Sequence, residues 1–287
     1  MINSVERIDK ESYEKLIKVY ERKSKRIDKI IKQSDRQQLS LIELNHKIVE
    51  QKEELNRLYA YNIDQQNIAK EKLEATVVNE LLEEESVKVE VLYQPSDILS
   101  GDFYSTYKLL DGSQLVFILD GQGHGISPAL TIFSISSTIA SLVKIVKSFD
   151  EFIERLFPMI QKFLGEIEQL SFIIMNIDLL ENELSYVSGG TYPLLILKEE
   201  ETLRIKSNNL PFMNFSTIPK IDTVNIENWK AMILYTDGLI EDENENIIKY
   251  HPDLLLKEKE LFAQAKEELS KYSYEDDITA IKISKLI

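Results

Sequence analysis

The sequence predicts an α+β fold, a sandwich of sheets and helices, preceded by a long helical region. Three observations support this prediction. The first 94 residues contain neither proline nor glycine, and such a stretch is typical of helix. From about residue 86 the chain changes to short apolar segments separated by turn residues. Several of these segments are neighbours joined by short turns, which favours local hairpins over the alternating strands and helices of a doubly wound sheet.

Residues 1–84 form the predicted helical region. Its apolar residues follow the a and d positions of a heptad repeat, and polar Gln51 and Asn62 interrupt the pattern. The pattern favours a coiled coil or a helical hairpin that forms a homodimer. The alternative is that the helices pack against the body of their own chain. The heptad positions are Leu41, Leu44, Ile48, Leu55 and Leu58, after which the spacing slips to four-residue steps at Tyr59 and Ile63.

Residues 85–287 form the predicted globular domain. The segment 87–93 alternates between apolar and polar residues, as a half-buried strand does, whereas 114–119 is almost continuously apolar, as a buried strand is. Two predicted hairpins pair 171–178 with 183–187 and 194–197 with 202–205. Further strands are expected at 231–235 and 278–283, and helices at 127–147, 150–165 and 252–271.

The net charge of −15 belongs almost wholly to the second region. Residues 1–80 carry 16 Lys and Arg against 15 Asp and Glu, and the remaining 207 residues carry 18 against 34. Such an acidic domain is not expected to bind nucleic acid, which requires a basic surface. The absence of cysteine excludes thiol nucleophiles and thiolate metal sites. With no apolar run of the ~20 residues that span a bilayer and no signal-peptide pattern, we expect a cytoplasmic protein without membrane attachment.

Several aspartates stand beside a buried apolar strand or a tight glycine turn. Asp102 lies in S-G-D-F-Y, Asp120 in I-L-D-G-Q-G-H-G, Asp237 in L-Y-T-D-G-L, and Asp276 and Asp277 in Y-E-D-D-I-T. A single aspartate of this kind is most often a turn or cap residue. However, strand ends also hold side chains rigidly, as a metal site requires. Oxygen ligands, with no cysteine and only three histidines, favour Mg²⁺ or Mn²⁺ over Zn²⁺.

The loop D-G-Q-G-H-G at residues 120–125 does not match the common phosphate-binding motifs. It has neither the G-x-G-x-x-G spacing of a dinucleotide site nor the G-K-S/T of a Walker loop, and it is not a G-x-S-x-G elbow. The remaining interpretation is a metal-binding turn, in which Asp120 is a ligand and a flexible backbone brings the Gly121 carbonyl to the ion. For His124, a general acid and a structural residue are both open.

Five motifs occur in a fixed order: G-D-F-Y, D-G-Q-G-H-G followed by P-A-L, G-G-T-Y-P, Y-T-D-G-L-I-E and D-D-I-T. In this order and at these separations they resemble the metal-dependent PPM serine/threonine phosphatases, and most closely the bacterial SpoIIE-like branch. The resemblance covers residues from about 85 to 287. It implies a PPM-type α-β-β-α sandwich with two Mn²⁺ or Mg²⁺ ions at one edge.

The resemblance also implies roles for individual residues. Asp120 would bridge both ions, and the Gly121 carbonyl would bind one of them. Asp237 and Asp276 would complete the ligands of the first ion, and Asp102 would lie in or near the ligand sphere of the second. Asp277 is a further ligand candidate ranked below Asp276, because neighbouring branches have asparagine there. The chain departs from the branch at Ser100, Ser105 and Thr191, none of which is a predicted ligand, so an active enzyme is expected.

By this resemblance the protein is expected to be a Mg²⁺/Mn²⁺-dependent phosphoserine/phosphothreonine protein phosphatase, with Asp120 and Asp237 as catalytic residues. A hydroxide bridging the two ions would attack phosphorus. Family analogy suggests a phosphorylated regulatory protein as substrate, such as an anti-sigma-factor antagonist. The N-terminal helices would regulate the enzyme by dimerising or by docking an activator protein. The alternatives are a catalytically idle phosphatase fold that serves as a dimeric interaction module, and an enzyme acting on small phosphoesters.

Overall fold

The computed structural model describes residues 10–75, 86–123, 125–199, 201–240, 250–258, 260–272 and 274–286. Its internal contacts divide the chain into two compact units, Met1–Asn62 and Ile63–Ile287. The predicted domain boundary between residues 84 and 85 lies outside the described residues. No helix in the described part of the chain is both long and apolar enough to cross a membrane.

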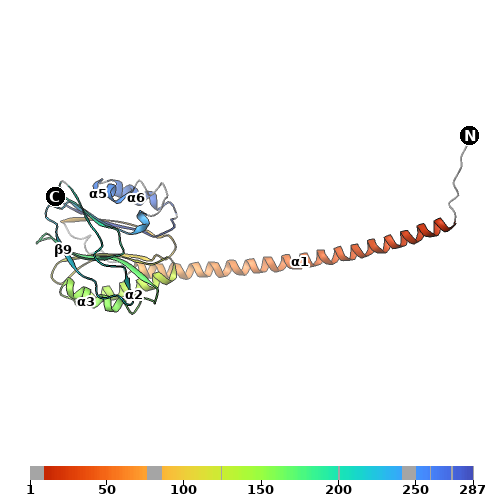
Figure 1. The fold of residues 1–287 in the computed structure, drawn as a ribbon, viewed down its shortest axis with the longest axis horizontal. Helices are drawn as coiled ribbons and strands as arrows, with labels where there is room; N and C mark the ends of the chain where they lie inside the picture. The colour runs from red at the N-terminus through yellow and green to blue at the C-terminus, as the bar shows by residue number, and fades with distance from the viewer. Residues whose placement is uncertain are drawn as a thin grey trace, which may run out of the picture. The chain divides into compact units, whose positions relative to one another are not determined.

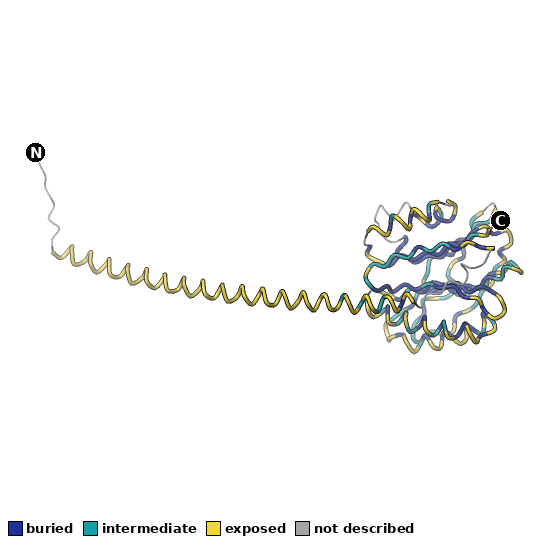
Figure 2. The backbone as a smooth tube through the Cα atoms, turned by 180° about the vertical axis from the view of Figure 1, so that it is seen from behind, coloured by how far each residue is buried: buried dark blue, intermediate teal, exposed yellow. Residues whose placement is uncertain are grey.

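Helix α1 (Lys10–Glu74) is a single uninterrupted α-helix that provides the described part of the first unit and continues into the second. Its length follows from a sequence without glycine or proline, the two residues that helices tolerate least. The predicted helical region is confirmed over this range, and the alternative of a helical hairpin is wrong there. Every described residue of 10–62 is exposed, including the apolar heptad positions (Figure 2).

Two antiparallel sheets, stacked face to face, form the centre of the second unit (Figure 1). The first sheet has the order β2-β3-β4-β5-β9, with β8 paired to β4, and the second has the order β1-β11-β10-β6-β7. The strands of the first sheet are β2 (Asp102–Lys108), β3 (Gln114–Gly121), β4 (Gln169–Asp178), β5 (Glu183–Gly189), β8 (Phe212–Met213) and β9 (Asp222–Asn225). Those of the second are β1 (Val87–Gln94), β6 (Leu194–Leu197), β7 (Thr202–Ile205), β10 (Ala231–Tyr235) and β11 (Ile278–Lys285).

Helices cover the outer faces of both sheets. Helices α2 (Ile126–Leu142) and α3 (Phe149–Ile160) pack on the first sheet, and α5 (Pro252–Lys257) and α6 (Leu261–Leu269) pack on the second (Figure 1). Three clusters of buried apolar side chains fill the spaces between these layers, one of them between the two sheets. Leu73, in the last turn of α1, belongs to the cluster under α2 and α3. The predicted α-β-β-α sandwich is confirmed.

The predicted helix 252–271 is wrong as a single element, because the structure has two helices there. Glu258 adopts an extended conformation directly after α5. The buried ammonium of Lys282, on β11, donates hydrogen bonds to the carbonyl oxygens of Leu255 (2.5 Å) and Glu258 (3.2 Å). A cation suits the carbonyl end of a helix. Because the side chain of Lys282 binds these carbonyl oxygens, helix α5 ends at its contact with β11.

Candidate metal centre

At one end of the sandwich, the positions that face the space between the sheets change from apolar to polar. Positions two apart on a strand face the same side. On β3, Ile118 belongs to the core between the sheets, and Asp120 is its next inward-facing neighbour. On β4, the inward positions from Ile173 toward the strand's start are Ser171 and Gln169. The inward-facing positions change from apolar to polar on the other strands as well. The polar residues there are Asp102 on β2, Thr236 after β10, and Thr279 and Asp277 at the start of β11.

Asp102 connects the two sheets at this polar end. The register of β2 and β3 places it directly opposite Asp120, and its side chain is only 2% exposed. Its Oδ2 accepts hydrogen bonds from the hydroxyls of Thr236 (3.0 Å) and Thr279 (2.5 Å) on the second sheet. Burial, followed by the charges of Asp120 and Asp277, raises the pKa of Asp102 well above its usual range, although the two hydroxyls oppose this shift.

The glycine loop packs backbone against backbone. The amide of Gly121 donates to the carbonyl oxygen of Gly101 at 3.0 Å, and a Cβ on Gly101 would stand 2.8 Å from the carbonyl oxygens of both Gly121 and Gly123. Gly123 and Gly125 have φ values of +86° and +95°, which glycine adopts without strain. The glycines thus allow a close turn after Asp120. The Gly121 carbonyl stays a predicted ligand, and His124 lies outside the described residues.

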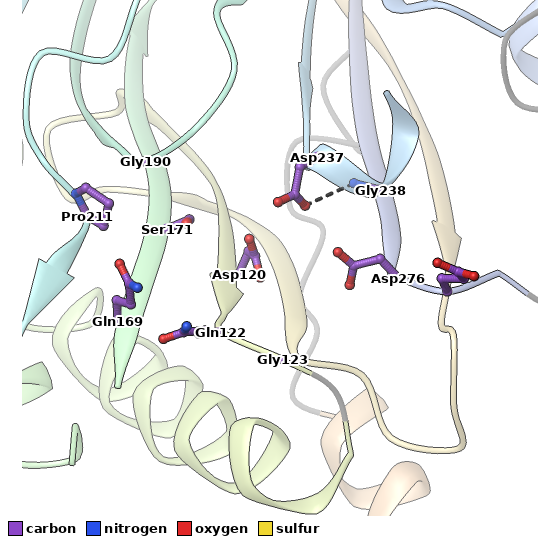
Figure 3. Close-up of a pocket in the computed structure, with 11 residues that line it drawn as sticks. Asp120, Gln122, Gly123, Gln169, Ser171, Gly190, Pro211, Asp237, Gly238 and Asp276 are labelled. Carbon is purple, nitrogen blue, oxygen red and sulfur yellow. Dashed lines mark hydrogen bonds between the residues drawn. The ribbon is translucent and has the colours of Figure 1, made fainter. Parts of the chain in front are cut away.

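Asp237 and Asp276 come from two other chain segments and line one pocket together with Asp120 (Figure 3). Asp237 begins the short 3₁₀ turn η2 (Asp237–Leu239) after β10, and its Oδ1 accepts the amide N–H of Gly238 at 3.0 Å. Asp276 precedes β11, and its Oδ1 accepts the amide N–H of Asp277 at 2.8 Å. The fold therefore brings together three aspartates that are up to 156 residues apart in the sequence.

Asp277 makes different contacts from its neighbour Asp276. Its side chain is 3% exposed and it is not among the described residues that line the pocket. Its Oδ1 accepts hydrogen bonds from the amide (2.7 Å) and the hydroxyl (2.9 Å) of Ser96, and its Oδ2 accepts the amide of Gly101 at 2.7 Å. Asp277 thus fixes the loop before β2, and its role as a metal ligand stays a prediction.

The pocket has a volume of about 640 Å³ and is strongly acidic. Burial, followed by the charges of Asp237, Asp276 and Asp277, raises the pKa of Asp120 to about 8. None of the described lining residues is basic, so no side chain of the pocket offsets this repulsion. The lining residues are Asp120, Gln122, Gly123, Gln169, Ser171, Gly190, Pro211, Asp237, Gly238, Glu275 and Asp276.

This donor set fits Mg²⁺ or Mn²⁺, which prefer carboxylate and carbonyl oxygens. A buried carboxylate is stable in its charged form when it is paired or binds a cation. Within the ranges that the structure describes, no three Asp, Glu or His side chains are already arranged to hold an ion. Repulsion between the carboxylates opposes such an arrangement, so we expect the side chains to turn toward one another only when a cation is present.

Some residues of this site were missed by the motif analysis. Thr236 and Thr279 hold the Asp102 carboxylate, and Gln122, Gln169 and Ser171 line the pocket. The available signal was the period of two along each strand, which places Thr279 on the same side as Asp277 and Ser171 on the same side as Gln169. Recognising that these sides face the aspartates also requires the pairing of the strands.

We expect the main effect of Asp277→Asn to be a lower melting temperature, with only a small loss of Mn²⁺ affinity. Ser96 and Gly101 donate to different oxygens of the carboxylate, and asparagine replaces one of these oxygens with an NH2 donor, so one of the two contacts is lost. One hydrogen bond to a charged group is worth about 1.5–3 kcal/mol, and the melting temperature should fall by several degrees. The matched variant Asp276→Asn should instead lose Mn²⁺ affinity strongly and change the melting temperature little. Thermal unfolding and calorimetric titration with Mn²⁺ check this; a greater loss of Mn²⁺ affinity in Asp277→Asn would instead support its role as a ligand.

Solved structures share the fold of this chain. The SiaA-PP2C domain of Pseudomonas aeruginosa superposes with a TM-score of 0.60 at 18% identity, covering 78% of this chain and 96% of that domain. The structure of RsbX in complex with magnesium has a TM-score of 0.54 at 18% identity, covering 71% of this chain and 98% of RsbX. The fold is that of the PP2C-type phosphatases.

Sequence comparison identifies the family. The family model "Stage II sporulation protein E (SpoIIE)" matches residues 111–285, and this chain belongs to that family. The phosphoserine phosphatase RsbP of Bacillus subtilis (strain 168) is 26% identical over an alignment of 195 residues that covers 63% of this chain and 48% of RsbP. The chain thus spans about half the length of the curated relative that it matches. The predicted membership of the SpoIIE-like branch is confirmed.

Proposed function

We propose that this protein is a Mg²⁺/Mn²⁺-dependent phosphoserine/phosphothreonine protein phosphatase. The observation that carries the proposal is the pocket in which Asp120, Asp237 and Asp276 meet without a basic side chain among the described lining residues. Such a pocket repels phosphate unless it first binds cations. It lies in a chain of the SpoIIE family, and its relative RsbP is named a phosphoserine phosphatase.

The roles proposed for the residues are those that the family resemblance implies, and the positions of the aspartates support them. Asp120, Asp237 and Asp276 would hold two divalent ions, with Asp120 contributing to both, and Asp102 and the Gly121 carbonyl would add further oxygen ligands. Ions bound in this way acidify a water molecule and offset charge on the transferred phosphoryl group. The hydroxyls of Thr236 and Thr279 keep the Asp102 carboxylate in place. The amide of Gly238 orients Asp237.

The proposed substrate is a phosphorylated regulatory protein, such as an anti-sigma-factor antagonist. This proposal rests on analogy within the family. The test is release of inorganic phosphate from a phosphoserine-containing anti-sigma-factor antagonist and from p-nitrophenyl phosphate, across a Mn²⁺ titration. We expect release that requires Mn²⁺, stops with a chelator, and has the higher kcat/KM for the protein. Turnover of the aryl phosphate alone would indicate an enzyme for small phosphoesters, and no turnover of either would indicate an idle interaction module.

The exposed apolar positions of α1 support its proposed role in dimerisation and regulation. Extended in both directions, the heptad has ten a and d positions with exposed apolar side chains, whereas Lys23, Ser34, Gln37 and Gln51 occupy other a and d positions. The ten apolar residues are Tyr13, Leu16, Tyr20, Ile27, Ile30, Leu41, Leu44, Ile48, Leu55 and Leu58. A repeat of this length is typical of a helix that pairs with another in a coiled coil. The proposed assembly is a homodimer, and the helices are also the proposed docking site for an activator protein.

We expect Ile48→Glu to convert the dimer to a monomer at micromolar concentration. The substitution places a charge at an a position, where the two helices would bury it against each other. The matched control is His46→Glu, which adds the same residue two positions away on the opposite side of the heptad and should leave the dimer intact. Analytical ultracentrifugation measures the masses, and circular dichroism checks that helicity is kept. The coiled-coil dimer would be contradicted if the wild type were a monomer in solution, or if the two variants had the same association state.

A further inference from the structure

The wall of the pocket across from the acidic residues is polar but uncharged. Asp237 and Asp276 lie on one side, Gln122 and Gln169 lie on the other, and Asp120 stands between them (Figure 3). Ser171, on the same strand as Gln169, also lines the pocket. The pocket therefore has two chemically different walls, one suited to cations and one that offers neutral hydrogen-bond donors.

The positions of the two glutamines are set by strand pairing. Along the register of β3 and β4, Asp120 pairs with Ser171 and Gly121 pairs with Leu170. The pairing continues by one more residue: the backbone N–H of Gln122 donates to the carbonyl oxygen of Gln169 at 3.2 Å. Gln169 and Ser171 face the pocket, since Leu170 between them is fully buried in the core on the other side of the sheet. The glutamines are therefore neighbours on a fixed scaffold.

The side-chain amides of both glutamines are available to a ligand. Gln169 is partly buried and Gln122 is exposed, and neither amide has a hydrogen-bond partner among the residues that the structure describes. Other polar side chains at this end are used internally: Asp102 by Thr236 and Thr279, and Asp277 by Ser96 and Gly101. Each glutamine amide presents two N–H donors.

A phosphate monoester in this pocket needs hydrogen-bond donors for the oxygens that do not face the cations. An arginine commonly fills this role through paired hydrogen bonds, but the described lining residues include no basic side chain. We propose that the side-chain amides of Gln169 and Gln122 bind phosphoryl oxygens of the substrate and determine its affinity. This inference rests on the proposed function, because it concerns the phosphorylated group that the phosphatase would bind.

Glutamine-to-methionine variants test the inference, because methionine keeps the length of the side chain and removes the donors. The first measurement is calorimetric titration of the Mn²⁺-loaded protein with inorganic phosphate. We expect Gln169→Met to weaken phosphate binding about fivefold, as loss of one net hydrogen bond does, and the double variant with Gln122→Met to weaken it further. KM for the phosphoserine protein should rise in step, and kcat should change less. Mn²⁺ affinity and melting temperature should stay unchanged.

The matched control is Gln264→Met, an exposed glutamine on α6 that does not line the pocket, and it should behave as the wild type. Unchanged phosphate affinity in the double variant would overturn the inference, as would a wild type that binds no phosphate. Loss of Mn²⁺ affinity in proportion to phosphate affinity would also overturn it, because the glutamines would then act through the metal site. Glutamine-dependent phosphate binding without turnover would support the inference and contradict the proposed phosphatase activity, so the two failures are distinguishable.

Discussion

The Asp120→Asn variant is expected to lose Mn²⁺-dependent phosphatase activity and Mn²⁺ binding together. Asp120 is the central carboxylate of the pocket (Figure 3) and the proposed shared ligand. Asparagine has the same shape but lacks the negative charge, so the remaining side chains offset less of the charge of two divalent ions. A metal ion contributes several kcal/mol to transition-state stabilisation, and a loss of about 4 kcal/mol corresponds to about 10³-fold in rate. Phosphate release and calorimetry with Mn²⁺ measure the two losses.

The same substitution should stabilise the metal-free protein. The pKa of Asp120 rises from 3.8 to about 8 on folding, so between about pH 4 and pH 8 the folded protein retains a proton that the unfolded chain has released. The free energy of unfolding of the metal-free wild type therefore falls as the pH rises through this window. The asparagine side chain of the variant does not titrate, so its stability lacks this dependence. The advantage of the variant over the wild type should be absent near pH 4 and largest at pH 8 and above.

Thermal unfolding in the presence of a chelator, at pH 5 and pH 8, checks the predicted gain. The expected difference at pH 8 is several degrees in melting temperature, and saturating Mn²⁺ should reverse the order by stabilising only the wild type. The matched control is Asp64→Asn, which removes the same charge from an exposed position on α1 and should have little effect. A metal-free variant that is less stable than the wild type at pH 8 would show that burial and the neighbouring aspartates do not raise the pKa of Asp120 on folding.

Local sequence patterns identified the individual aspartates but not their partners. Asp120 and Asp237 each come after an apolar run and directly before a glycine, a pattern contained within ten residues of sequence. The contact of Asp102 with Thr236 and Thr279 joins residues 134 and 177 positions apart. Such contacts depend on which strands pair and on which sheets face each other, and no local period contains that information. The hydroxyl donors and the glutamine wall were therefore visible only in the fold.

The elements that the sequence analysis missed have the same physical cause. Strand β2 has buried residues on both faces, two of which are the polar Ser105 and Thr106, so it shows neither the alternation of a half-buried strand nor the apolar run that marked 114–119. The break between α5 and α6 depends on Lys282, which lies on a strand more than 20 residues further along the chain. On β1, buried Val87 and Val89 stand on either side of exposed Lys88, and this alternation was enough to predict the strand.

The Gly238→Ala variant is expected to disrupt the candidate metal centre by separating two backbone segments that carry proposed ligands. Gly238 packs so closely on the segment before β11 that an added Cβ would stand 2.2 Å from the carbonyl oxygen of Asp277 and 3.0 Å from its carbonyl carbon. The neighbour is backbone, which cannot rotate away as a flexible side chain can. Relief of the overlap requires η2 and the segment 276–277 to separate. Because Asp237 and Asp276 lie on these two segments, the separation moves two proposed ligands apart.

Both the stability and the metal affinity of Gly238→Ala should therefore fall. Overpacking typically costs about 1–3 kcal/mol, which corresponds to a decrease of roughly 2–12 °C in melting temperature for a domain of this size. The matched control is Gly165→Ala, where an added Cβ would approach no atom closer than 3.5 Å and should be tolerated. Mn²⁺ titration of both variants, at a temperature where both are folded, separates the local effect from general instability. If Gly238→Ala bound Mn²⁺ with wild-type affinity while folded, then Asp237 and Asp276 would not need their observed spacing, and the proposal that they share an ion would be wrong.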